Sequence, residues 1–135
     1  MERIKRVVDR LVDTRFDDIA AINAQLQTSL GAVQAGDGFD VRTSDSGSLG
    51  GIPVSGIELR SAKDDASHAT LLLRFPLPGV PLESAPWPNA TLYPPRPDAV
   101  DSAAYWSVDA APDTRVILGL SADEKHLIQM TIRKN

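Results

Sequence analysis

RFPLPGVPLESAPWPNATLYPPRPD, residues 74–98, decides how this chain can fold, because it holds eight of the chain's ten prolines. Each proline removes a backbone N–H donor and restricts the residue before it, so neither a helix nor a central strand can run through this stretch. We therefore expect residues 76–98 to form a long, stiff and largely extended connection between two groups of strands.

Length, charge and composition bound the possible functions. The chain has 135 residues, enough for one domain with one hydrophobic core, and it contains no cysteine, which excludes disulfides and thiolate metal sites. A formal net charge of −4 argues against a nucleic-acid partner. No apolar run approaches a membrane span, and no secretory signal is present, so we expect a cytoplasmic protein, or a periplasmic one whose signal has been removed.

Residues 2–31 are expected to form a pair of helices. Apolar residues recur at helical spacing over the first dozen positions, which predicts an amphipathic first helix. Thr14 and Asp17 resemble a capping box for a second helix, and Gly31 can end it in a left-handed conformation. The apolar positions of the second helix would be Phe16, Ile19, Ile22, Leu26 and Leu30.

The rest of the chain has the period of two that is typical of strands. Residues 36–75 contain a short strand at Phe39 and Val41, a loop at 43–51 (TSDSGSLGG), and two longer strands, the first with an expected β-bulge at Gly56. Residues 102–134 predict a meander of three antiparallel strands. The sequence thus predicts a single α+β domain, 1–135, with two N-terminal helices packed on one face of an antiparallel sheet of about six strands, and the proline-rich connection between strands 3 and 4.

Few residues could support catalysis. His68 and His126 each begin a predicted strand and could meet at one end of the sheet, where Asp64, Asp65 or Asp123 could join them in a metal site. No metal-binding spacing supports that site, and ordinary strand-end histidines are the simpler interpretation. We therefore expect no enzyme, no metal and no cofactor, with an enzyme using both histidines as a lesser alternative.

The proline-rich connection has the most functional content. It is too apolar for a plain linker, so it either covers the sheet or presents side chains to a partner. Large aromatic side chains on a stiff loop are good binding anchors. The candidate partner-binding residues are Trp87, Tyr93, Leu82 and Arg96, the last within the P-x-x-P pattern of residues 94–97.

The order of elements, the acidic composition and the C-terminal pattern AAYWSVDAAPDTRVILGLSADEKHLIQMTIRK, residues 103–134, resemble those of small α+β bacterial immunity proteins. This resemblance in organisation implies a non-catalytic protein-interaction module that binds and neutralises a secreted toxin, with no nucleic-acid or membrane partner. A small-ligand-binding domain with an apolar pocket between helices and sheet is the alternative. An unpaired sheet edge could also form a homodimer.

Overall fold

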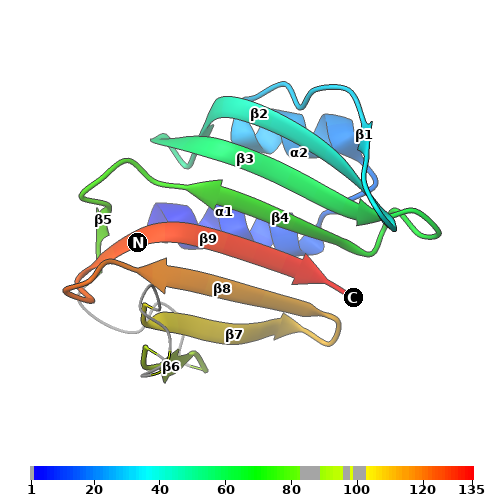
Figure 1. The fold of residues 1–135 in the computed structure, drawn as a ribbon. Coiled ribbons are helices and arrows are strands. Elements are labelled where there is room, and N and C mark those ends of the chain that lie inside the picture. Colours follow the sequence, from blue (N-terminus) through cyan, green and yellow to red (C-terminus); the bar gives the residue numbers. More distant parts are fainter. Residues whose placement is uncertain (1, 83–88, 96–97, 99–102) are drawn as a thin grey trace.

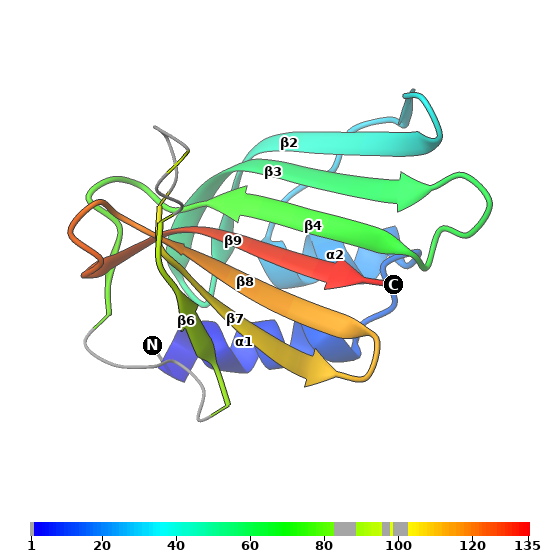
Figure 2. The same cartoon turned by 60° about the horizontal axis from the view of Figure 1, so that its bottom comes forward.

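The computed structural model describes residues 2–82, 89–95, 98 and 103–135, which form one antiparallel sheet with two helices on one of its sides (Figures 1 and 2). The helices are α1 (Glu2–Asp13) and α2 (Ile19–Leu26). The strands are β1 (Gln34–Ala35), β2 (Phe39–Leu49), β3 (Ile52–Ala62), β4 (Ala69–Arg74), β5 (Val80–Pro81), β6 (Thr91–Tyr93), β7 (Tyr105–Ala111), β8 (Thr114–Leu120) and β9 (His126–Lys134).

The strands lie in the order β1-β2-β3-β4-β9-β8-β7-β6, and β5 pairs with the first residues of β9. The C-terminal strand β9 therefore occupies the centre of the sheet, between β4 and β8. The proline-rich connection leaves β4 in the centre and reaches β6 at the far edge. Residues that are distant in the sequence thus become direct neighbours across β3, β4, β9 and β8.

The second helix is shorter than its apolar pattern predicted. Asp18, not Thr14, caps α2, and its side chain accepts a hydrogen bond of 3.1 Å from the N–H of Ala21. The helix ends at Gln27, which has a left-handed conformation with φ 48°, four residues before Gly31. Phe16 precedes the helix and is fully buried in the core. Phe16 therefore has the spacing of a helical core residue but enters the core from the segment before the helix.

The expectation of an α+β domain with about six strands is wrong: among the described residues the sheet has nine strands, and strand residues far outnumber helical ones. Strand content was also underestimated within β2, whose second half was predicted to be a loop because it is rich in serine and glycine. Gly50 and Gly51 have φ values of 59° and 84°, as in a two-residue type I′ hairpin turn, so residues 43–49 pair with β3 instead. Gly47 is needed here, because a Cβ atom at this position would lie 2.6 Å from the carbonyl oxygen of Leu26.

The proline-rich connection accounts for two further strands. Val80 and Pro81 pair with β9, and residues 91–93 pair with β7 at the edge of the sheet. Pro81 is tolerated in β5 because so short a strand needs few backbone donors, and β6 contains no proline. The ninth strand, β1, covers the start of β2. The connection therefore joins β4 to β7, which correspond to the predicted strands 3 and 4, but it is itself partly strand.

The β-bulge predicted at Gly56 is confirmed: the register between β3 and β4 shifts between Ser55 and Glu58, and Gly56 has φ +56°. The core lies between the helices and the sheet. It contains mainly aliphatic residues, all with 8% or less of their surface exposed, including Ile4, Val8, Leu11, Phe16, Ile22, Leu26, Leu59, Leu71, Leu73, Val116, Leu118, Met130 and Ile132.

Candidate functional site on the open sheet face

The two sides of the sheet differ sharply in what covers them. On β4, Leu71 and Leu73 are fully buried beneath the helices, whereas Thr70 and Leu72 point to the opposite side and are only partly buried. Both helices lie on the first side (Figures 1 and 2), and the described residues leave the middle of the second side uncovered. We call this second side the open face. Its strand positions include Arg60, Thr70, Leu72, Tyr93, Tyr105, Arg115, Ile117, Thr131 and Arg133.

Near one end of the open face, three arginines and a threonine line up across four strands. Arg60 is paired with Thr70, Thr70 with Arg133, and Arg133 with Arg115. We call these four residues the arginine row. Like charges directly opposite each other on neighbouring strands destabilise a sheet, so the Arg133–Arg115 pair costs stability rather than adding to it. Such a pair indicates that the position serves something other than folding.

Among the described residues, carboxylates pair with the two outer arginines of the arginine row, and the positive charge of Arg133 has no such partner. The Nε atom of Arg60 lies 3.0 Å from a carboxylate oxygen of Glu58, and that of Arg115 lies 3.3 Å from Asp109. Arg133 forms no ion pair with any residue that the structure describes. The positive charge of the row is therefore concentrated at Arg133.

A shallow hollow of about 520 Å³ lies over this part of the face. Among the described residues its lining includes no aspartate or glutamate. Arg60 and Arg133 supply charge, Thr70 and Thr131 supply hydroxyl groups, and apolar surface is also present. The full lining is Gly38, Phe39, Arg60, Ser61, Ala62, His68, Ala69, Thr70, Leu72, Thr131, Arg133, Lys134 and Asn135.

Lys134 contributes little charge to the hollow, because its amino group turns to the helix side of the sheet. It donates hydrogen bonds to the carbonyl oxygens of Val12, at 2.7 Å, and Thr14, and it lies 4.5 Å from the centre of the Phe16 ring. Burial lowers the pKa of this amino group, although the nearby Asp13 opposes the shift. Lys134 ties the end of α1 to the sheet and is a structural residue.

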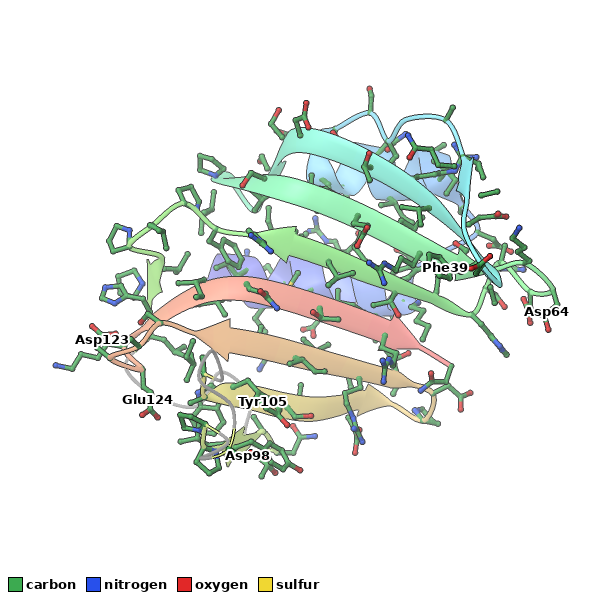
Figure 3. All side chains as sticks on the ribbon, in the orientation of Figure 1. Phe39, Asp64, Asp98, Tyr105, Asp123 and Glu124 are labelled. Atoms are coloured by element: carbon green, nitrogen blue, oxygen red, sulfur yellow. The ribbon has the colours of Figure 1, made fainter. Side chains whose placement is uncertain are left out.

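The other end of the open face is aromatic. The rings of Tyr93 on β6 and Tyr105 on β7 stack with centres 5.1 Å apart and planes 15° apart. We call these two residues the tyrosine pair. Between them and the arginine row, Leu72, Thr131 and Ile117 are direct cross-strand neighbours. The arginine row, these three residues and the tyrosine pair together form one strip along the open face. Figure 3 shows both ends of this strip, with Phe39 at the margin of the hollow and Tyr105 on β7.

The four residues predicted to bind a partner do not form one group. Tyr93 is 44% exposed and belongs to the tyrosine pair. Leu82 is only 8% exposed and packs with Ala104 and Leu120 in a small second core, so in this structure it holds the proline-rich connection against the sheet. Trp87 and Arg96 lie outside the described residues, and their assignment stays a prediction. Sequence reasoning missed Tyr105 and the arginine row, which only the strand order brings together.

The two histidines do not meet. β4 and β9 are antiparallel, so His68, before β4, lies near the end of β9, whereas His126 begins β9 at the other end of the sheet. Figure 3 places the turns that carry them, marked by Asp64 and Asp123, at opposite ends. No group of three metal-ligating side chains occurs among the described residues. A shared histidine site therefore lacks the geometry it requires.

Each histidine instead sits beside a carboxylate in a polar turn. His68 lies 3.5 Å from Asp65, and His126 lies 3.6 Å from Asp123. Hydrogen bonds from the hydroxyl and the N–H of Ser67 lower the pKa of Asp65. The Ser121 hydroxyl and the N–H of Lys125 lower the pKa of Asp123 to about 2. Both carboxylates are fixed as acceptors in their turns, which is a structural role.

The edges of the sheet are short or protected. β1 and β6 have two and three residues. Beyond β1, the edge of β2 is met by the preceding loop, in which the N–H of Gly31 donates to the Thr43 carbonyl at 2.9 Å and the Thr28 hydroxyl to the Ser46 carbonyl at 2.6 Å. These features limit strand addition at the edge of β2. This edge is the longer of the two sheet edges at which a second copy of the chain could pair.

Comparison with known proteins gives no relative: no family model matches the chain, and no similar curated protein or solved structure was found. In the part of the chain that the structure describes, neither helix has the length and apolar character needed to cross a membrane.

Proposed function

We propose that this protein is a non-catalytic protein-interaction module, of the inhibitor or immunity type, whose open face binds an acidic surface of a partner protein. The observation that carries this proposal is the uncovered strip from the arginine row to the tyrosine pair. It combines exposed tyrosine, partly buried aliphatic side chains and arginine, the residue types enriched at protein interfaces and their binding hot spots.

The charge of the open face favours an acidic partner. Glu58 and Asp109 are already engaged by arginines, so among the described residues of the arginine row Arg133 is the charge left for a partner to neutralise. The chain as a whole carries −4, so a basic strip on it would orient an acidic protein toward this face and away from the rest of the surface.

The rigidity of the face suits inhibition by occlusion. The strip lies on six paired strands, so little ordering is needed when a partner binds, and less binding energy is lost. The tyrosine pair joins this strip to the proline-rich connection, because Tyr93 ends the strand that the connection contributes. A partner on the open face would therefore also reach the connection, where Trp87 and Arg96 are expected to add contacts.

The alternative of a small-ligand pocket between helices and sheet has less support. Fully buried side chains from α1, α2 and the sheet fill that space, including Ile4, Leu26 and Leu71. The hollow at the open face, a second one beside the β-bulge of β3 and a third at the β7–β8 turn have no lining residue from either helix.

The test begins with a pull-down by the tagged protein from lysate of its source organism, with and without toxin expression, read by mass spectrometry. The recovered partner is then purified, and its affinity is measured by calorimetry for the wild type, Tyr105→Ala, Trp87→Ala and Arg6→Gln. Arg6 is exposed on α1 and serves as the control.

We expect Tyr105→Ala and Trp87→Ala each to weaken binding by roughly 2 kcal/mol, as for other aromatic anchors, and Arg6→Gln to leave it unchanged. Binding should also weaken as salt rises, because the partner is acidic. A folded Tyr105→Ala protein with undiminished affinity, or a partner whose contact surface is basic, would overturn the proposal.

A further inference from the structure

The hollow over the arginine row has the composition of an oxyanion site. Strand neighbours are about 4.8 Å apart, so Arg60 and Arg133, two strands apart on either side of Thr70, have their backbones about 10 Å apart. Arginine side chains are long enough to turn toward one group between them. That group would lie above the Thr70 hydroxyl, which can donate a third hydrogen bond.

The free donors of the two arginines match this geometry. Glu58 approaches only the Nε atom of Arg60, and the guanidinium carbon of Arg60 lies 5.4 Å from the centre of the Phe39 ring. Stacking on a ring holds the guanidinium in place and leaves its outer N–H groups available. Arg133 has no carboxylate partner among the described residues, so both of its terminal nitrogens are available for an anion.

The remaining lining defines the rest of the ligand. Leu72 and Phe39 form apolar surface beside the arginines, and Thr131 adds a second hydroxyl group. A carboxylate or phosphate group on a short aliphatic stem suits both parts of the lining. Its anionic group would bind the arginines, and its methylene groups would contact the apolar surface. A bare inorganic anion would use only the first part.

We propose that this hollow is an oxyanion-binding site, in which Arg60, Arg133 and Thr70 hold a carboxylate or phosphate group while Leu72 and Phe39 contact its aliphatic stem. The site deepens the proposed function and rests on it for the source of the anion, which is an acidic or phosphorylated side chain of the partner protein. Arg133 is its principal residue, because none of the described carboxylates forms an ion pair with it.

The site can be tested without the partner. The ¹⁵N-labelled full chain is titrated with acetate, glutarate and inorganic phosphate, with sodium chloride at equal ionic strength as the control, and backbone amide and arginine Nε signals are followed by NMR. We expect saturable shifts confined to the surroundings of Arg60, Thr70 and Arg133, with glutarate binding more tightly than acetate because it has an aliphatic stem. Saturation by phosphate alone would assign a phosphorylated source instead of a carboxylate.

Arg133→Gln removes the charge and keeps a shorter, polar side chain, and it should weaken anion binding about tenfold. Arg6→Gln, on α1, removes the same charge elsewhere and should leave anion binding unchanged. Chloride-like, non-saturable shifts with all three anions, or equal affinities for the wild type and Arg133→Gln, would overturn the site. If the partner still binds through Tyr105 in that case, the proposed function stands and only the oxyanion site fails.

Discussion

The two faces of the sheet are built from the same strands, yet they have opposite characters. On β9, Met130 and Ile132 are fully buried under the helices, while the alternating Thr131 and Arg133 face solvent on the open side. The covered face contains closely packed aliphatic residues, and the open face places two arginines directly opposite each other. Alternate residues of one strand thus serve stability and, in our proposal, recognition.

The largest expected effect comes from breaking the covered face. Leu71→Ala should lower the free energy of unfolding by about 3 kcal/mol, because it leaves a cavity in a core whose side chains are fully buried. Leu72→Ala, the next residue of β4 but on the open face, should cost less than about 1 kcal/mol. Urea denaturation of both variants measures the difference, and equal losses would show that the two faces do not differ in this way.

Gly47 tests how closely α2 approaches β2. Gly47→Ala would place a Cβ atom 2.6 Å from the Leu26 carbonyl oxygen and should destabilise the protein by about 1 to 3 kcal/mol. Gly31→Ala is the matched control, because its Cβ atom would lie 3.4 Å from the nearest atom, an ordinary contact. Denaturation midpoints that fall equally for both variants would contradict the close approach.

Arg133 should separate stability from recognition. Replacing it with glutamine removes the like-charge pair with Arg115, so the free energy of unfolding should rise by about 0.2 to 0.5 kcal/mol. The gain should shrink in high salt, because salt screens the repulsion. A loss of stability in Arg133→Gln, measured by urea denaturation at low salt, would mean that this arginine supports the fold.

The smallest effect concerns the turn before β9. Because hydrogen bonds in the folded state lower the pKa of Asp123 to about 2, its contribution is present above the ordinary carboxyl pKa of about 3.9 and is lost as the pH falls toward 2. Ser121→Ala removes the main hydrogen bond, so the pKa of Asp123 should move up toward its ordinary value. Carboxyl ¹³C titration checks this, and an unchanged pKa in the variant would exclude the serine as the cause.

Local patterns predicted much of the covered face. The alternation of β4 and β9 marked Leu71, Leu73 and Met130 as facing one side, and the spacing of apolar residues marked α1. Residues 43–49 were missed because serine and glycine have low strand propensity. The signal that could have revealed β2 was Gly50–Gly51, a two-residue hairpin turn between apolar residues.

The open face depends on strand order, which single-strand patterns do not contain. Arg115 and Arg133 are paired by the consecutive strands β8 and β9, but Arg60 and Thr70 join them only because β9 also pairs with β4. The same antiparallel order separates His68 from His126, which excludes the lesser alternative of a site shared by the two histidines. Tyr105 was missed for the same reason, since only the pairing of β6 with β7 stacks it on Tyr93.

The most direct test of the open face as the binding surface is methyl cross-saturation NMR on the complex with the purified partner. Irradiating the partner should reduce the methyl signals of Leu72 and Ile117, on the open face, and leave those of Leu71 and Ile132, on the covered face, unchanged. Loss of signal confined to methyl groups of the helices, or at the exposed Leu77 with none at Leu72 and Ile117, would contradict the central claim and place the partner elsewhere.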